Sequence, residues 1–244
     1  MKQSIFEIIE NTALTSTVYR MRLAGDTSAI TAPGQFVNIK LDGKFLRRPI
    51  SVCDCKEGEL TLVYKVVGAG TAQMANMHVA EELDILTGLG NGYDLTTAGD
   101  RPLLLGGGVG VPPLYMLAKQ LIAAGKTVSV VLGFNKASEV FYAEEFKALG
   151  CDVTVTTVDG SMGVKGFVTD ALPTDYTYFY TCGPEPMLKA VYRATNTSGQ
   201  MSFEERMGCG FGACMGCSCK TITGYKRICR EGPVMRKEEI LWEK

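Results

Sequence analysis

The sequence predicts an α/β protein with an all-β first part. We expect an N-terminal antiparallel β-barrel over residues 1–97, a doubly wound parallel α/β domain over 98–200, and a small cysteine-rich lobe over 201–244. Three observations predict this class. Short strand-like segments fill the first hundred residues, strand-like and helix-like segments alternate in the next hundred, and five of the nine cysteines follow residue 208.

Length and composition limit the class of protein. The chain has 244 residues, of which 46% are hydrophobic, enough for a large core in one to two domains with an appendage. The net charge of −1 gives no electrostatic basis for binding nucleic acid or an anionic membrane. The N-terminal residues 1–14 contain no apolar run of signal-peptide length, and no stretch of the sequence reaches the ~20 apolar residues of a membrane span. We therefore expect a cytoplasmic protein, whose thiols stay reduced and serve metal or redox chemistry rather than disulfides.

The barrel is predicted from six strand-like segments with Gly, Asp and Asn between them. Their even spacing of about ten residues is typical of a small antiparallel barrel or sandwich. A helix-like stretch over 70–82 interrupts them and carries His78, which we expect to face solvent. The strand-like segments are 4–14, 17–25, 34–42, 50–58, 59–68 and 82–90.

From Asp100 onward strands and helices alternate. This order predicts a parallel sheet whose ligand lies at the carboxyl ends of the strands. The predicted strands are 101–108, 127–134, 151–160 and 176–183, and the predicted helices are 111–125, 138–150 and 184–196.

Four cysteines near the end of the chain have the spacing C-x4-C-x2-C-x11-C, namely Cys209, Cys214, Cys217 and Cys229. Plant-type [2Fe–2S] sites begin with the same C-x4-C-x2-C run. Interleaved glycines allow the backbone to approach the sulfurs closely. The alternatives are a zinc site, although zinc usually takes two C-x-x-C pairs, and unliganded thiols.

The other cysteines have less specific surroundings. We interpret Cys219 as a bystander just past the third ligand. Cys53, Cys55 and Cys151 are expected to be small core residues, because free cysteine is among the most buried residue types.

Two features of the first hundred residues suit a phosphate-bearing ligand. One is the run Arg48, Pro49, Ile50 and Ser51, in which a guanidinium and a hydroxyl can contact the same ligand. The guanidinium of Arg48 suits a pyrophosphate, and the hydroxyl of Ser51 suits a heterocycle nitrogen. The pair Gly70-Thr71 opens a helix, whose free N–H groups can bind phosphate. The alternative for this pair is a strand-to-helix turn capped by Thr71.

The second part carries a glycine turn, Gly107, Gly108 and Gly110, between a strand and a helix. It departs from the G-x-G-x-x-G dinucleotide pattern, and the next strand ends in GFNK, without an acidic residue to read a ribose. Cys182-Gly183 ends the last predicted strand, where a ligand would lie. The alternative there is a plain turn with Cys182 buried.

Taken in order, these motifs resemble the ferredoxin–NADP⁺ reductase superfamily. The matching residues are R-P-x-S at 48–51, Gly70-Thr71, G-G-G-V-G at 106–110 and C-G-P-x-x-M at 182–187. The cysteine spacing after FEERMGCG is similar to that of dihydroorotate dehydrogenase B electron-transfer subunits. GLGNGYDL at 88–95 resembles the superfamily's turn between barrel and sheet.

The resemblance implies FAD on the barrel, NAD(H) as substrate of the α/β domain, and a [2Fe–2S] cluster on the four cysteines. It implies that residues 48–51, Val63, Tyr64, Lys65, Gly70 and Thr71 contact FAD, and that the glycine turn and Cys182-Gly183 shape the nicotinamide site. It further implies electron exchange with an FMN-containing dihydroorotate dehydrogenase subunit of pyrimidine biosynthesis, in a heterotetramer of two copies of each. No general acid or base of this chain is then needed.

Two other functions remain open at this point. One is a reductase subunit of another complex, such as a sulfide dehydrogenase or a hydrogenase-type diaphorase. The other is a zinc-stabilised nucleotide or redox sensor without turnover, which a colourless protein would indicate. Lys136 is the only basic residue of GFNK, which favours NADH over NADPH.

Overall fold

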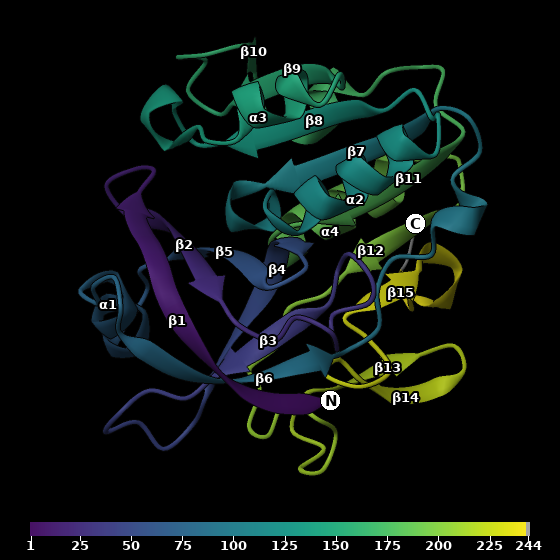
Figure 1. Cartoon of the computed structure of the whole chain (residues 1–244). Coiled ribbons are helices and arrows are strands. Elements are labelled where there is room, and N and C mark those ends of the chain that lie inside the picture. Colours follow the sequence, from purple (N-terminus) through teal and green to yellow (C-terminus); the bar gives the residue numbers. More distant parts are fainter. Residues whose placement is uncertain (243–244) are drawn as a thin grey trace.

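The computed structural model describes residues 1–242. Figure 1 shows a barrel, a parallel sheet above it, and a smaller lobe beside the barrel. The fold class predicted from the sequence is confirmed. Within residues 1–242, no helix is long and apolar enough to cross a bilayer.

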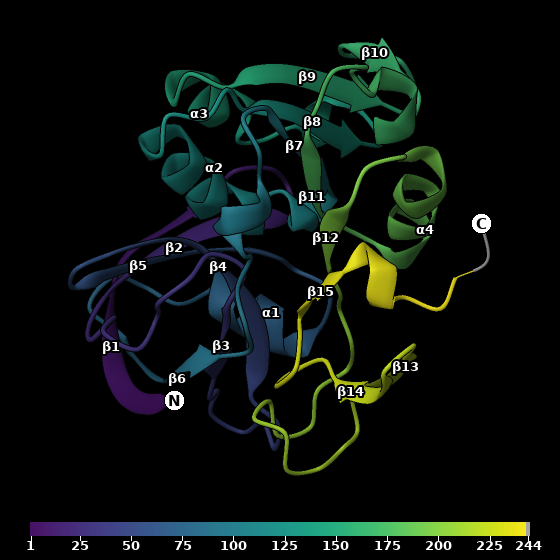
Figure 2. The same cartoon turned by 90° about the vertical axis from the view of Figure 1, so that its right-hand side faces the viewer.

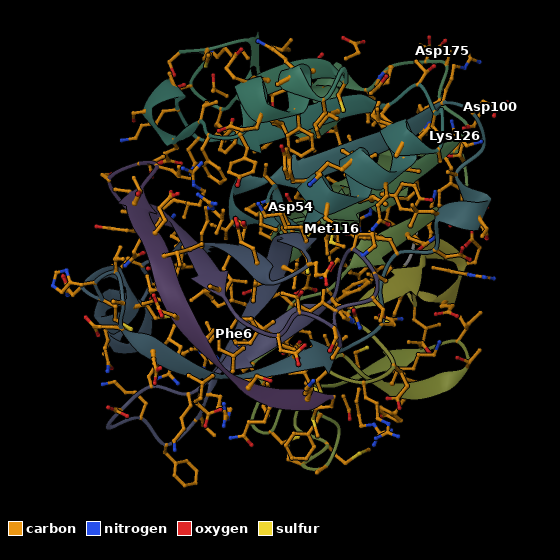
Figure 3. The ribbon with its side chains drawn as sticks, in the orientation of Figure 1. Phe6, Asp54, Asp100, Met116, Lys126 and Asp175 are labelled. Atoms are coloured by element: carbon orange, nitrogen blue, oxygen red, sulfur yellow. The ribbon has the colours of Figure 1, made fainter. Side chains whose placement is uncertain are left out.

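The barrel is closed, with strand order β1-β2-β5-β4-β3-β6 and antiparallel pairs throughout. Alternation along β1 points every second side chain inward, so that Phe6 and Ile8 are fully buried. Figure 3 shows Phe6 inside the barrel. The elements are β1 (Lys2–Ala13), β2 (Val18–Ala24), β3 (Phe36–Ile39), β4 (Arg48–Lys56), β5 (Glu59–Lys65), α1 (Ala69–Ala75) and β6 (Glu82–Leu89). Helix α1 is shorter than expected, and His78 lies exposed in the loop after it.

The second part is a sheet of order β10-β9-β8-β7-β11-β12-β15, in which the first six strands run parallel. It is doubly wound. Leu104 of β7 packs in one core cluster with residues of α2 and α3, whereas Leu103 packs in another with residues of α4. The elements are β7 (Pro102–Gly107), α2 (Pro113–Ala123), β8 (Ser129–Phe134), α3 (Ala143–Ala148), β9 (Asp152–Thr157), β10 (Val164–Lys165), β11 (Tyr178–Cys182), α4 (Glu185–Ala194) and β12 (Gly199–Ser202).

Helix α3 covers only part of the stretch predicted as helical. Tyr142 precedes it with φ of 65°, in the left-handed region, which a helix cannot continue through. This residue is buried, and its ring packs edge-on against Tyr115 of α2 at 5.1 Å. Aromatic packing between the two helices therefore overrides the helical periodicity of the sequence.

Barrel and sheet are packed as one body. Lys119 of α2 donates to both carboxylate oxygens of Asp54 on β4, at 2.8 and 2.7 Å. Met116, also on α2, belongs to the barrel's core cluster. Figure 3 shows Asp54 and Met116 at the junction of the two domains. Of the expected core cysteines, Cys53 and Cys151 are buried and Cys55 is half-buried.

The cysteine lobe holds the hairpin β13 (Ser218–Thr221) and β14 (Gly224–Arg227), followed by β15 (Val234–Arg236). Strand β15 pairs antiparallel with β12 and so extends the nucleotide sheet (Figure 2). This strand was not expected from the sequence, because three residues are too few to show a period. The domain limits given above remain a prediction.

Two polar residues fasten the lobe. The buried Lys237 donates to the carbonyl oxygens of Thr195 and Thr197, just past α4. On the other side, the Asn91 amide donates to the carbonyl oxygens of Glu231 and Val234 and accepts the N–H of Val234. The lobe is thus hydrogen-bonded both to the sheet and to the segment that links barrel and sheet.

Candidate cofactor and cluster sites

The nucleotide sheet has one switch point. From β7 the chain proceeds to β8 on one side, while β11 lies on the other. Open α/β sheets bind ligands at such a point, outside the carboxyl ends of the strands. Here these ends carry the glycine turn 106–110 and Cys182-Gly183, the two motifs expected to hold the nicotinamide nucleotide.

The two motifs interlock through glycines. A Cβ on Gly110 would overlap the carbonyl of Cys182, and a Cβ on Gly107 would overlap the sulfur of Met187. The same sulfur lies 2.8 Å from where a Cβ on Gly183 would stand. Glycine is therefore required at position 110, where a Cβ would meet the backbone of Cys182 and Gly183. At Gly107 and Gly183 the absence of a Cβ leaves room for the side chain of Met187, the methionine of C-G-P-x-x-M. Burial raises the pKa of the Cys182 thiol to about 12, so that it stays neutral.

On the barrel, the structure brings Arg48 of β4 to the start of α1. A Cβ on Gly70 would overlap the guanidinium of Arg48, so the glycine leaves room for this side chain. The hydroxyl of Thr71 accepts from the N–H of Val67 at 2.9 Å and donates to the carbonyl of Gly68 at 3.1 Å. Thr71 therefore stabilises its own turn. The Arg48 guanidinium, which donates to the carbonyl of Leu46, is a charged group beside this turn whose chemistry suits a pyrophosphate.

The remaining expected FAD residues lie on the neighbouring strands β4 and β5. Pro49, Ile50 and Ser51 are half-buried along β4. On β5, the side chain of Tyr64 lies in the barrel core and donates to the Asn11 amide oxygen at 3.1 Å. Val63 and Lys65 point to the opposite face, so Tyr64 presents only its backbone to a ligand there.

The barrel and sheet motifs are neighbours. Val63 of β5 and Val111, which follows the glycine turn, belong to one core cluster. The glycine turn itself packs against β5. A flavin on β4 and β5 and a nucleotide at the switch point would therefore lie next to each other.

The structure arranges the four predicted cluster cysteines as two neighbouring pairs. Cys209 lies beside Cys214, whose N–H points at the Cys209 sulfur from 3.5 Å. Cys217 lies beside Cys229, whose N–H donates to the Cys217 sulfur at 3.4 Å. Within residues 1–242, no three Cys, His, Asp or Glu side chains converge on a point that a single ion would occupy. Two thiol pairs suit the two irons of a [2Fe–2S] cluster better than one tetrahedral zinc.

The long x11 spacing has a structural reason. Residues 218–227 form the hairpin β13–β14, with Ser218 opposite Arg227. A hairpin returns the chain to its starting point, so it brings Cys229 back to Cys217. Cys219 lies within the hairpin, opposite Lys226, and is half-buried.

The thiol environments differ. Burial raises the pKa of Cys209, but N–H groups of Phe211, Cys214 and Ala213 directed at its sulfur outweigh burial and lower the pKa to about 6. For Cys229, burial and the neighbouring Cys217 thiol raise the pKa to about 12. Cys209 is therefore ready to bind metal as a thiolate, whereas Cys229 must lose its proton when the metal arrives.

Sequence reasoning missed two residues that hold the cysteine loop. Arg227 donates to the carbonyl of Gly212 at 2.7 Å and pairs with Glu231, while Asn38 of the barrel donates to the carbonyl of Cys209 at 3.2 Å. Neither belongs to a motif, and no pattern in the sequence marks them, since their partners are backbone carbonyls.

Comparison with known proteins agrees with this arrangement. Residues 204–241 match the model of the iron–sulfur cluster binding domain of dihydroorotate dehydrogenase B. Residues 104–193 match that of the oxidoreductase NAD-binding domain. Both matches confirm expectations derived from the sequence.

Two relatives that match nearly the whole chain carry the same name. The chain is 43% identical to the dihydroorotate dehydrogenase B (NAD(+)) electron transfer subunit of Fusobacterium nucleatum, over 98% of this chain and 99% of that protein. It is 45% identical to the subunit of that name from Bacillus caldolyticus, over 91% and 92% of the two chains.

Solved structures show the same fold. A structure of NADH-dependent reduced ferredoxin–NADP oxidoreductase superposes with a TM-score of 0.87 and 32% identity, covering 97% of this chain and 90% of the other. The flavohemoglobin of Malassezia yamatoensis, at 19% identity and TM-score 0.66, shares the fold alone. Barrel, switch point, paired thiols and full-length relatives lead to one conclusion: this chain belongs to the family of dihydroorotate dehydrogenase B (NAD(+)) electron transfer subunits, NAD-dependent oxidoreductase subunits with flavin and iron–sulfur cofactors.

Proposed function

We propose that this chain passes electrons between NAD(H), FAD and a [2Fe–2S] cluster and an FMN-containing dihydroorotate dehydrogenase subunit, with two copies of each chain in a cytoplasmic heterotetramer. The observation that supports it best concerns β4, which carries R-P-I-S. This strand lies between β5, against which the glycine turn packs, and β3, whose Asn38 donates to Cys209 of the cysteine loop. Bound FAD supplies the conversion of a two-electron hydride into single electrons, which a cluster requires. The chain's own residues bind and align the groups.

The proposed assignments follow the contacts described above. Arg48 would face the FAD pyrophosphate, with Gly70 making room for its guanidinium, and residues 49–51 and 63–65 would line the flavin. Gly107, Gly108, Gly110 and Cys182-Gly183 form the nucleotide cradle. Cys209 and Cys214 would hold one iron, and Cys217 and Cys229 the other.

The chain is proposed to lack a dihydroorotate site, because every motif is used for FAD, nucleotide or cluster. We expect the isolated holoprotein to oxidise NADH with ferricyanide and to leave dihydroorotate unchanged. The measurement is anaerobic turnover of both substrates by the purified chain, with and without an added FMN-containing catalytic subunit. Dihydroorotate oxidation by the chain alone would contradict the proposal.

The similarity to a ferredoxin–NADP oxidoreductase supports a second candidate, a reductase subunit of another complex. Co-purification distinguishes the two. If the chain is isolated with a dihydroorotate dehydrogenase subunit and transfers NADH electrons to it, the first proposal holds. If it is isolated with a different oxidoreductase and the dihydroorotate dehydrogenase subunit does not bind, the second replaces it.

We propose that the cysteine loop is part of the partner interface. Phe211 and Met215 lie between the cluster cysteines and are 40% and 55% exposed. Apolar and aromatic side chains are enriched at interface cores, and electrons leaving a cluster need a nearby acceptor. A charge buried there would be unpaired, so Phe211→Asp and Met215→Asp should each weaken association about thirtyfold, an effect of about 2 kcal/mol.

The measurement is affinity for the catalytic subunit together with NADH–ferricyanide activity, which both variants should retain. Ile222→Asp is a matched control. Ile222 is 59% exposed in the same lobe, but it lies at the turn of the β13–β14 hairpin, away from the ligand loop. Unchanged affinity in both loop variants would place the partner elsewhere.

A further inference from the structure

The strand next to the R-P-I-S strand carries a buried amide. Asn38 lies on β3, opposite Pro49 of β4, and is 1% exposed. Its neighbours Val37 and Ile39 belong to the barrel core. Because side chains alternate along a strand, Asn38 points away from that core, to the outside of the barrel.

The cysteine loop covers this outer face. The Asn38 amide nitrogen donates to the carbonyl oxygen of Cys209 at 3.2 Å. The next residue, Gly210, has φ of +79°, and a Cβ there would stand 2.5 Å from the same nitrogen. The loop therefore needs glycine at this point in order to lie directly on Asn38.

The amide oxygen of Asn38 differs from its nitrogen in its contacts. Within residues 1–242, the buried Asn38 amide oxygen has no hydrogen-bond partner. Buried side-chain acceptors without a partner are rare in native proteins, since each costs free energy. An apolar residue of similar size would avoid that cost, so stability alone does not explain an asparagine here.

The backbone of Asn38 is braced by the residue that precedes Arg48. Arg47 donates to the Asn38 carbonyl at 3.3 Å and to the Asp84 carbonyl at 2.9 Å, and it pairs with the Asp84 carboxylate at 3.0 Å. These contacts fix β3 between β4 and β6, so the amide has little freedom to follow a movement of the loop.

We propose that Asn38 is a positioning residue for electron transfer between FAD and the [2Fe–2S] cluster. It holds Cys209, the first cluster ligand, at a fixed separation one strand away from Arg48–Ser51. One electron leaves the reduced flavin and one enters the cluster, and Asn38 itself is neither oxidised nor reduced. The inference rests on the proposed function. It goes further by naming a residue that affects electron transfer from flavin to cluster but not flavin reduction by NADH.

The test is Asn38→Leu in the complete chain with its cofactors, mixed anaerobically with NADH in a stopped-flow instrument. Flavin reduction should stay within about twofold of the parent, because the substitution leaves the glycine turn and Cys182-Gly183 untouched. Cluster reduction should slow about tenfold or more, since small misplacements of reacting groups have effects of that order. The electron paramagnetic resonance spectrum of the reduced cluster should also shift, because the backbone at Cys209 loses its contact with the barrel.

Thr87→Val is the matched control. Thr87 is fully buried on β6 of the same barrel and donates one hydrogen bond to a backbone carbonyl, that of Lys2 at 3.3 Å. It should change neither the cluster reduction rate nor the spectrum, although it loses a comparable contact. Asn38→Ser serves if the leucine variant does not fold, since it shortens the side chain and removes the amide donor.

An unchanged cluster reduction rate and an unchanged spectrum in the Asn38 variant would overturn the inference. Loss of iron from both Asn38 variants, with flavin still reduced by NADH, would also overturn it, because Asn38 would then serve cluster assembly. Failure of NADH to reduce the flavin in the parent chain would instead contradict the proposed function itself.

Discussion

Cys217→Ser should purify with its flavin but without its cluster, whereas Cys219→Ser should keep about two irons per chain. Cys217 is 2% exposed, and its sulfur accepts the N–H of Cys229, the cysteine that the hairpin brings to it. A serine oxygen is a poorer ligand than thiolate for this site. Cys219 lies within the hairpin, outside both thiol pairs. The measurement is iron and sulfide content together with the visible absorbance of each purified variant.

Cys151→Ser is the matched control for the loss of a buried thiol. Cys151 lies next to β9 in the nucleotide domain, far along the chain from the lobe, and its variant should keep its iron. If Cys219→Ser loses the cluster instead, the ligand set has been assigned to the wrong cysteine. The same variants also distinguish a cluster from zinc, because iron and labile sulfide would be absent from a zinc protein.

Arg48→Ala should weaken FAD binding by about two orders of magnitude. Two charge-assisted hydrogen bonds from a guanidinium to a pyrophosphate contribute about 3 kcal/mol together. Arg48→Lys should restore only part of this, since an ammonium keeps the charge without the bidentate geometry. Gly70→Val should act in the same direction, because its side chain would displace the Arg48 guanidinium. The measurement is fluorescence titration of the flavin-free protein with FAD.

Arg101→Ala is the control for loss of an arginine. Arg101 is exposed and pairs with Asp175 at 2.7 Å. Figure 3 shows Asp175 in the part of the nucleotide domain far from the barrel. Its variant should bind FAD as the parent does. Equal FAD affinity in Arg48→Ala and the parent would remove Arg48 from the proposed site.

The sequence predicts well those features whose signal lies in consecutive residues. The six barrel strands and the parallel strands that end in Gly107 and Cys182 show clear alternation or apolar runs, and the structure contains them. Helix α1 was overestimated, since a helix-like composition continues past Ala75 into a loop. Helix α3 was overestimated for another reason, because Tyr142 adopts a left-handed conformation in order to pack its ring.

In the candidate sites, too, the residues that could be predicted are those marked by a pattern in consecutive residues. Cysteine spacing identifies the thiols, since ligands of one cluster lie on a short loop. The contacts of Asn38, Asn91 and Arg227 could not be predicted, although Asn91 lies in the GLGNGYDL turn, because each residue holds a backbone carbonyl of a distant segment and any polar residue in a sequence has that capacity. Interlocking of Gly107 with Met187 becomes visible only when β7 and β11 are placed side by side.

Strand β15 has a consequence for how this architecture tolerates truncation. Because β15 pairs with β12, the cysteine lobe supplies the last strand of the nucleotide sheet. A chain cut after β12 would leave the N–H and C=O groups of that strand as an open edge, a template for pairing with other molecules. It would also withdraw Lys237 from the carbonyls that follow α4. A flavin reductase made by deleting the lobe should therefore aggregate unless the new edge is covered, which makes the lobe an integral part of the nucleotide domain rather than a detachable module.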